Sequence, residues 1–194
     1  MLPEWRKEMQ SRRKLEGIDV SHWEGRIDFS EVRRAGIRIV YIKASEGDRE
    51  VDPDFERNYR EAQTAGLKIG FYHYLTARTV EEGREQARHF AGVIREKHYE
   101  ACPAMDFESF GDLDREQINA VSLAFLRELE TLTKKMVAVY SDAGNAANVF
   151  DERLAFYPLW IAEYGVKRPE MNNDWREWAG WQYTDAGRVS GIKG

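Results

Sequence analysis

Short apolar runs alternate with longer amphipathic stretches along most of this chain, and this alternation limits the possible folds more than any other feature. The runs are rich in β-branched and aromatic residues, which favour strands, whereas the stretches between them repeat apolar residues at helical spacing. Strands that alternate with helices in this way are typical of parallel strand–helix units. The sequence therefore predicts an α/β fold.

The same pattern gives approximate bounds for each element. Strands are expected at residues 17–20, 37–44, 67–74, 102–107, 136–140, 157–162 and 180–183. Helices are expected at residues 29–35, 54–65, 80–95 and 114–132. Beyond these the connecting segments become too short and irregular for full helices. We therefore expect a β/α barrel whose helices are incomplete towards its end.

Length and charge limit the number of domains and the classes of partner. The 194 residues fit one domain, and no low-complexity linker or internal repeat divides them. A formal net charge of -5 leaves no excess of basic residues to neutralise a phosphate backbone, so nucleic acid is not expected as a partner. With 32% charged residues and no long apolar run, no membrane insertion is expected.

The thiol and imidazole groups show no sign of a metal site. Cys102 is the single cysteine, so it excludes an intrachain disulfide and is expected to be an inert core thiol at the start of a buried strand. His22, His89 and His98 have no ligand spacing, and neither a metal nor a cofactor is expected. Residues 1–15 contain no apolar core of a signal peptide and are interpreted as an N-terminal extension.

Polar residues stand where several predicted strands end. The C-terminal strand ends form the active site in β/α barrels, so these residues are expected to face one mouth. They are Asp19, the segment 43–46, His73, Tyr74, Asp106 and Glu108. Among them, His73 lies between aromatic residues and is interpreted as a hydrogen-bonded wall residue rather than a base.

Asp106 and Glu108 are two positions apart on a predicted strand, which places both on one face with Cα atoms roughly 6.5 to 7 Å apart. In glycoside hydrolysis one protonated carboxyl group protonates the leaving oxygen while another stabilises positive charge on the sugar. Crowding raises the pKa of one member. The alternative is a pair of solvated strand-end charges, but Asp19 at another strand end favours chemistry.

Aromatic residues gather near the ends of the last predicted strands. They are Trp160, Tyr164, Trp181 and Tyr183. Each one alone is interpreted more readily as a core residue, but their grouping favours a surface that stacks on sugar rings. Gln182 among them would bind a hydroxyl or acetamido group of the sugar.

A series of short motifs resembles one family throughout its length. The motifs are GIDVS at residues 17–21 with Trp23, IKASEG at 42–47, GFYHY at 70–74, MDFE at 105–108, VYS at 139–141, LWIA at 159–162 and WQYT at 181–184. In content and order they resemble the lysozymes of glycoside hydrolase family 25, which are N-acetylmuramidases. The resemblance covers nearly everything from Gly17 to Gly194 and identifies residues 16–194 as a catalytic barrel.

The resemblance implies an irregular TIM-like barrel with eight strands and about five helices, in a single domain. It also implies cleavage of the β-1,4 bond between N-acetylmuramic acid and N-acetylglucosamine in bacterial peptidoglycan. Glu108 would be the general acid, Asp106 its partner in the Asp-x-Glu motif, and Asp19 the third carboxylate. Direct attack by a carboxylate and participation of the substrate's acetamido group both stay open, and we favour the second. The residues expected to bind substrate are Glu46, Tyr72, Tyr74, Tyr140, Trp160, Tyr164, Gln182 and Asp185.

The chain departs from the family pattern at Gly194, where the pattern would continue into a last strand with a Val-Asp pair. We therefore expect the last strand to be truncated. That Asp usually belongs to the acidic site, so its absence argues against full activity. Asp185 is expected to line the cleft without replacing it.

Two other functions fit part of the pattern. One is a catalytically weak or inactive barrel that binds cell-wall glycan, but pure binding gives no reason to gather carboxylates around an acidic polymer. The other is a chitinase-like hydrolase, which shares the Asp-x-Glu arrangement but fits the flanking motifs less well. In each case we expect the protein to act on the cell wall, outside the cell that makes it or after lysis. We also expect a monomer, because a cleft for a long polymer must stay open at both ends.

Overall fold

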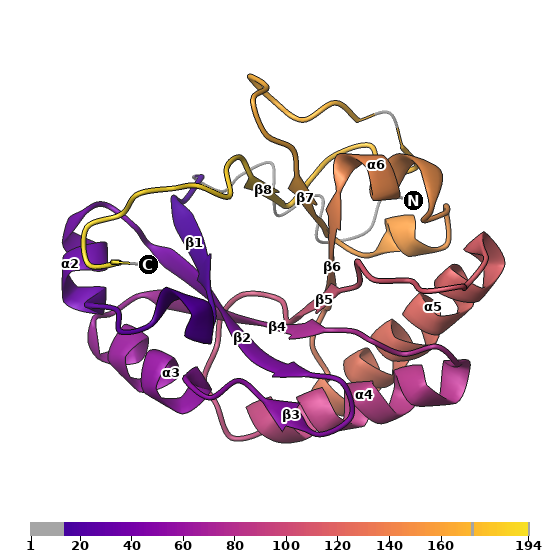
Figure 1. The fold of residues 1–194 in the computed structure, drawn as a ribbon, viewed down its shortest axis with the longest axis horizontal. Coiled ribbons are helices and arrows are strands. Elements are labelled where there is room, and N and C mark those ends of the chain that lie inside the picture. The colour runs from indigo at the N-terminus through magenta and orange to yellow at the C-terminus, as the bar shows by residue number, and fades with distance from the viewer. Residues whose placement is uncertain (1–13, 172, 194) are drawn as a thin grey trace.

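A curled sheet of parallel strands lies at the centre of the molecule (Figure 1). The computed structural model describes residues 14–171 and 173–193. The strands follow the order β1 (Gly17–Val20), β2 (Ile39–Glu46), β4 (Lys68–Tyr74), β5 (Ala104–Asp106), β6 (Ala138–Asp142), β7 (Leu159–Ala162) and β8 (Gly180–Gln182). Each is parallel to the next, and the short β3 (Glu50–Val51) pairs antiparallel with β2. The predicted α/β class is confirmed.

Five α-helices lie within the described ranges. They are α2 (Phe29–Arg34), α3 (Phe55–Thr64), α4 (Val80–Ile94), α5 (Arg115–Thr133) and α6 (Ala143–Asn148), and the 3-10 turns are η1 (His22–Glu24) and η2 (Leu154–Phe156). Asp28, Thr79, Asp114 and Asp142 start four of the helices by accepting a hydrogen bond from a backbone N–H of the first turn. In Figure 1, helices α2 to α5 follow the outside of the sheet, while irregular chain surrounds β7 and β8. The expectation of incomplete helices at the end is confirmed.

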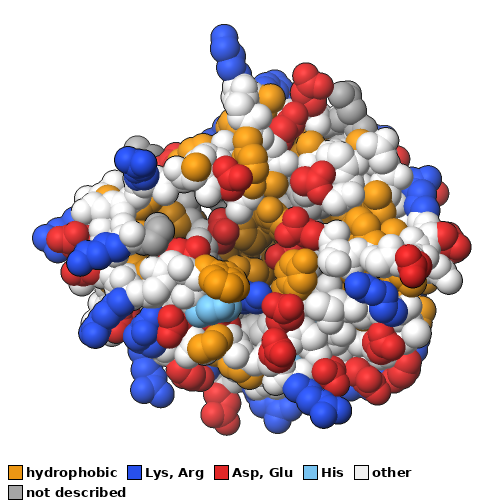
Figure 2. All heavy atoms as spheres, viewed as in Figure 1, with side chains coloured by type: hydrophobic (Ala, Val, Ile, Leu, Met, Phe, Trp, Pro, Cys, Tyr) orange, Lys and Arg blue, Asp and Glu red, His pale blue; other side chains and the backbone are white. Residues whose placement is uncertain are grey.

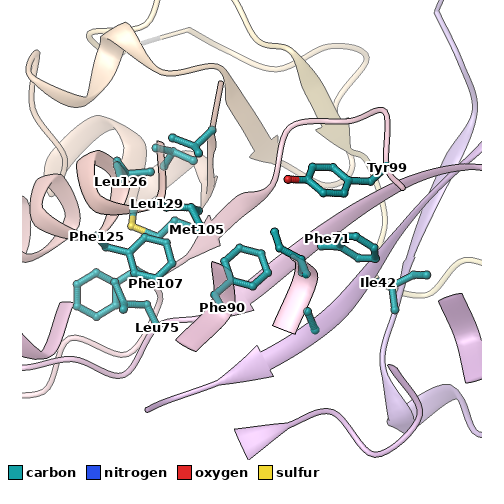
Figure 3. Packing of buried hydrophobic residues seen from close by; sticks show 14 of the residues in the cluster. Ile42, Phe71, Leu75, Phe90, Tyr99, Met105, Phe107, Phe125, Leu126 and Leu129 are labelled. Atoms are coloured by element: carbon teal, nitrogen blue, oxygen red, sulfur yellow. The ribbon is translucent and has the colours of Figure 1, made fainter. Parts of the chain in front are cut away.

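The outer face of the sheet is apolar and lies under α4 and α5 (Figure 3). Alternate strand residues point to this side, so buried side chains such as Ile42, Phe71 and Met105 come from neighbouring strands. The helices contribute Phe90, Phe125, Leu126 and Leu129 to the same cluster. Each such side chain stabilises the fold by about 1.5 to 3 kcal/mol relative to its exposed state.

The inner face is built from large rings beside small residues. Tyr41 on β2 is paired with Gly70 on β4, and a Cβ atom at Gly70 would lie 2.6 Å from the Tyr41 ring. Trp160 on β7 is paired with Gly180 on β8, where a Cβ would lie 3.1 Å from the indole. The glycines thus make room for aromatic side chains that fill the concave side of the sheet.

The first and last strands of the sheet, β1 and β8, are bridged by side chains. Gln182 donates from Nε2 to both carboxylate oxygens of Asp19 at 3.1 and 3.0 Å, and Tyr183 donates to Glu16 at 3.1 Å. The chain after β8 returns to α2, where the Asp28 N–H donates to the Gly191 carbonyl at 2.8 Å. In the described part of the chain, strands β1 and β8 remain the two ends of the strand order, because they are linked by side chains and not paired with each other. The expected barrel is therefore present in a coarser form, as a curled parallel sheet that resembles a half-barrel.

Several predicted bounds are wrong by a few residues. The expected strand 102–107 is only Ala104–Asp106, because Pro103 has no N–H to donate and pairing begins after it. Cys102 precedes this strand and is only partly buried, so its expected place in a buried strand is wrong. Strand β2 extends to Glu46 through a register shift between Lys43 and Ser45. The short elements β3 and α6 were not predicted.

Residues 1–13 of the expected N-terminal extension lie outside the described residues. Within the described ranges, no helix combines the length and apolar character needed to cross a membrane.

Candidate active site

Two carboxylates from distant strands meet on the concave side of the sheet. Asp19 lies on β1 and Asp106 ends β5, and both are directed inwards by the same alternation that places Tyr72 of β4 between them. The pKa of Tyr72 is raised well above its ordinary value by burial, with the charges of Asp19 and Asp106 adding to the effect. Of the strand ends that were expected to share one mouth, those with Asp19 and Asp106 therefore lie on the same side of the sheet.

Asp106 and Glu108 form a coupled carboxyl pair. Asp106 is 7% exposed, and its Oδ1 atom has no hydrogen-bond partner among the described protein groups. Glu108 lies in the exposed loop after β5, close enough to Asp106 for the two carboxyl groups to affect each other's ionisation. Burial raises the pKa of Asp106 well above its ordinary value, and the charge of Glu108 raises it further. The pair therefore retains one shared proton at pH values where an isolated Asp has lost its own.

Lys43 belongs to the segment 43–46 that was expected at the mouth, but no role was predicted for it. Its Nζ atom lies 2.7 Å from Glu46 Oε2 and 5.2 Å from the centre of the Tyr74 ring. The charge of Lys43 lowers the pKa of Asp106, against the effects of burial and Glu108. The sequence did contain a signal for this position, which is a lysine inside an otherwise apolar strand. Because its neighbours Ile42 and Ala44 face the outer core, alternation directs Lys43 to the inner face.

Gln182 joins Asp19 to two phenols. Its Oε1 atom accepts from Tyr140 at 2.9 Å and from Tyr164 at 2.6 Å, while its Nε2 donates to Asp19. Burial raises the pKa of Asp19, the hydrogen bonds from Gln182 lower it, and the charge of Glu24 in η1 raises it. Glu24 is a nearby charge that the sequence did not single out.

An aromatic floor lies beneath these polar groups. The centre of the Trp160 ring system is 4.5 Å from that of Tyr41, 4.8 Å from Tyr140 and 6.4 Å from Tyr72. Tyr41 is fixed by a hydrogen bond from its hydroxyl to the Cys102 carbonyl at 3.0 Å. Burial raises the pKa of Tyr140, so its phenol stays protonated and remains a donor. Tyr41 belongs to the floor but was not predicted.

Acidic side chains surround a hollow on this face, and hydrophobic side chains lie inside it (Figure 2). At the rim, Tyr74 has its pKa raised by burial first and then by Asp106, Glu108 and Glu46. Burial raises the pKa of Tyr164, and the charge of Asp185 raises it further. These mutual effects show that the predicted catalytic carboxyl groups lie close to the phenols of the predicted substrate-binding tyrosines. A separate hollow of about 580 Å³, lined by residues 166–171, contains none of these carboxylates.

Three residues considered from the sequence lie elsewhere. His73 is fully buried on the outer face, with Nδ1 2.9 Å from Ser45 Oγ and Nε2 3.3 Å from Gln86 Oε1. The expected hydrogen-bonded, structural role is therefore confirmed, but its expected place at the mouth is wrong. Trp181 pairs in register with the outward Ile161 and donates to the Glu163 carbonyl at 2.8 Å. Tyr183 packs against Trp181 at 5.6 Å. The expected sugar-stacking role is therefore wrong for Trp181 and is not supported for Tyr183.

Comparisons with known proteins identify relatives that match 93% of this chain. The uncharacterized protein YegX of Escherichia coli strain K12 is 36% identical over 189 residues, covering 93% of this chain and 66% of that protein. The autolytic lysozyme of Clostridium acetobutylicum is 35% identical over 181 residues, covering 93% of this chain and 53% of that protein. The chain thus spans less than two thirds of the length of either relative.

A solved structure and a family profile also match nearly the whole chain. The crystal structure of the bacterial lysozyme from Streptomyces coelicolor is 30% identical, with a TM-score of 0.82 over 95% of this chain and 90% of that one. The profile of the glycosyl hydrolases family 25 matches residues 18–192, which include every strand and helix described above except Gly17, the first residue of β1. The chain belongs to glycosyl hydrolases family 25.

Proposed function

We propose that this chain is a muramidase, which hydrolyses the β-1,4 bond between N-acetylmuramic acid and N-acetylglucosamine in bacterial peptidoglycan. The observation that supports this most is the carboxyl pair of Asp106 and Glu108, which retains a proton beside the hollow that Asp19 also faces. Family membership and similarity to proteins named lysozyme support the same assignment.

Glu108 is the general acid in this proposal, because it is the exposed member of the pair and can reach a glycan. It gives its proton to the glycosidic oxygen as the bond to the anomeric carbon breaks. Asp106, held in the wall, orients the acetamido group, whose carbonyl oxygen bonds to the anomeric carbon. Water then attacks that carbon and displaces the acetamido oxygen, so the acetamido group is restored, and one proton of the water goes to the Glu108 carboxylate. Asp19 as an anion stabilises the positive charge that develops on the sugar ring.

The substrate cleft in this proposal is the hollow above the aromatic floor. Its lining contains both rings that can lie against sugar faces and polar groups that can bind hydroxyl or acetamido groups. The proposed substrate-binding residues are Glu46, Tyr72, Tyr74, Tyr140, Trp160, Tyr164, Gln182 and Asp185. Residues 16–194 would form the catalytic unit after the extension 1–15, as an irregular TIM-like barrel closed between β1 and β8 by side chains. We propose that it acts on the cell wall as a monomer.

The test is the chemistry of the ends that the protein creates. Purified protein is incubated with peptidoglycan beside Glu108→Gln, and new reducing ends are identified by reduction and mass spectrometry. New ends on N-acetylmuramic acid are expected, and Glu108→Gln should lower their rate by about 10² to 10⁴-fold. Glu96→Gln is the matched control, because Glu96 is exposed at the opposite edge of the sheet, after α4. It should leave the rate unchanged.

Two other outcomes would contradict the proposal. Protein that releases no ends but sediments with peptidoglycan would be a glycan-binding barrel. New ends on N-acetylglucosamine would assign the cleavage to the other linkage of the polymer.

A further inference from the structure

Gln182 uses both ends of its amide group within the protein. Tyr140 from β6 and Tyr164 from the loop after β7 both donate to Oε1, at 2.9 and 2.6 Å. A carbonyl oxygen has two lone pairs, so these bonds saturate it and fix the orientation of the amide. The NH₂ group must then face Asp19, where it lies 3.1 and 3.0 Å from the two carboxylate oxygens.

This orientation selects one ionisation state of Asp19. An ionised carboxylate only accepts hydrogen bonds and fits an NH₂ group that contacts both of its oxygens. A protonated Asp19 would place a hydroxyl hydrogen against a donor, which is unfavourable. The titratable groups that face Asp19 are Glu24 of η1, Tyr72 of β4, Asp106 of β5, Tyr140 of β6 and Tyr164 of the loop after β7. They are carboxyl groups and phenols, so they do not favour the anion by opposite charge.

The position of Gln182 in the sheet adds a mechanical role. Strands β1 and β8 are the two ends of the strand order, and among the described residues the side chain of Gln182 on β8 links them through its hydrogen bonds to Asp19 on β1. Gln182 itself is held by pairing of β8 with β7 and by the two phenols. The distance of Asp19 from the floor therefore depends on this amide.

We propose that Gln182 is a positioning residue, whose amide, oriented by Tyr140 and Tyr164, holds Asp19 in one place as an anion for the reaction. This inference rests on the proposed function and deepens it. In this inference Gln182 does not bind the sugar directly but controls Asp19, the carboxylate that faces the sugar. Tyr164, which is 44% exposed, is the outer member of the chain of hydrogen bonds.

Gln182→Glu tests the proposal with little change of shape. The new carboxylate can still accept from both phenols, but it loses the NH₂ donors and places a negative charge beside Asp19. The titration midpoint of Asp19 should rise by about one pH unit or more. Tyr164→Phe should raise it less, because the amide keeps one phenol. Gln63→Glu on α3 is the matched control, since it adds the same charge at an exposed site away from the hollow.

The midpoint is measured by ¹³C NMR of the side-chain carboxyl groups, with the Asp19 resonance assigned by its loss in Asp19→Asn. This readout does not need activity, so it remains valid if peptidoglycan is not the substrate. The pH profile of kcat/KM on peptidoglycan is measured on the same variants. If Gln182 positions Asp19, the acidic limb of the profile moves upward with the NMR midpoint, and kcat falls more than KM rises.

Two results would overturn the proposal. An Asp19 midpoint that is the same in Gln182→Glu and in the Gln63→Glu control would mean that the amide does not control ionisation. If the Asp19 midpoint shifts but KM rises equally at every pH and the acidic limb of the kcat/KM profile does not move, Gln182 binds the substrate directly. If Gln182→Glu does not fold, Tyr164→Phe decides by the same two measurements, because its side chain is at the surface.

Discussion

The two faces of the curled sheet are built from alternate residues of the same strands, yet they have opposite chemistry. On the outer face, Ile42, Phe71 and Met105 are buried under helices and have no polar atoms to satisfy. On the inner face, Tyr72 and Asp106 stand one position away from such residues and share a hollow with charged groups. A shift of one residue in register would exchange the two faces, so the fold and the site depend on the same alternation.

Each face contains a deeply buried titratable residue, and the two residues differ in how their polar atoms are satisfied. His73 on the outer face has both ring nitrogens hydrogen-bonded and lies against Phe90 and Phe125, and burial lowers its pKa to about 3. Asp106 on the inner face has an unpartnered oxygen and a raised pKa beside Glu108. Burial alone therefore does not distinguish a structural residue from a reactive one. The incomplete hydrogen bonding of Asp106 does.

Asp106→Asn should separate activity from stability on the inner face. Activity should fall by about 10²-fold or more, because Asn cannot share a proton with Glu108. The folded state raises the pKa of Asp106 above its ordinary 3.8, so it binds more protons than the unfolded chain and loses stability as the pH rises through the raised pKa. Asn cannot ionise, and the variant should therefore unfold at a higher temperature than the unmutated chain at pH 7.

Thermal unfolding at several pH values checks the second half of this prediction. A gain of about 2 to 4 °C is expected for each kcal/mol. The gain should disappear below pH 3.8, where the unmutated Asp106 is protonated in both states. A variant that unfolds at a lower temperature at pH 7 would mean that Asp106 is a stabilising structural group like His73.

His73 should show the opposite dependence on pH. Its pKa is about 3 in the folded chain against 6.5 for the free side chain, so the unfolded state binds the extra proton between these values. Stability is then complete above pH 6.5 and decreases as the pH falls, by up to about 1.4 kcal/mol per pH unit. His73→Gln should weaken this dependence without lowering kcat/KM of the folded enzyme. Urea unfolding from pH 7 to 4 measures the slope, and an unchanged slope would assign acid sensitivity to other groups.

Much of the outer face could be predicted from the sequence, because it depends on local patterns. Strand β1 and helices α3, α4 and α5 were placed within one or two residues, since apolar periodicity and capping residues act over short distances. The exceptions have local causes that periodicity does not include. Pro103 shortened β5, and the register shift after Lys43 lengthened β2.

The inner face could be predicted only in outline. Strand ends indicated that Asp19, Asp106 and Glu108 would meet, but not which of them would be buried. The bond from Gln182 to Asp19 joins residues 163 positions apart, and no local pattern reports it. Lys43 was inside a recognised motif, yet its effect on Asp106 depends on the distance between two strands. Side-chain partners of this kind follow from how the sheet curls, which the sequence pattern does not define.

Glycine substitutions give the smallest and most local test of the difference between the faces. Gly70→Ala would place a Cβ atom 2.6 Å from the Tyr41 ring on the inner face, and the ring cannot move away without disturbing Trp160. Overpacking of this kind should cost about 1 to 3 kcal/mol. Gly92→Ala is the matched control, because its Cβ would meet nothing within 4 Å in α4. It should stabilise the protein by about 0.5 to 1 kcal/mol through helix propensity.

The two glycine variants also differ in their expected effect on the site. A displaced Tyr41 would shift the aromatic floor under Asp19 and Asp106, so Gly70→Ala should lower kcat/KM even in the fraction that remains folded. Gly92→Ala should leave kcat/KM unchanged, because α4 contacts the outer face. Chemical unfolding together with rates normalised to folded protein separates the two effects. If Gly70→Ala loses stability but keeps full activity per folded molecule, the floor is not coupled to the carboxylates, and the two faces are more independent than their shared strands imply.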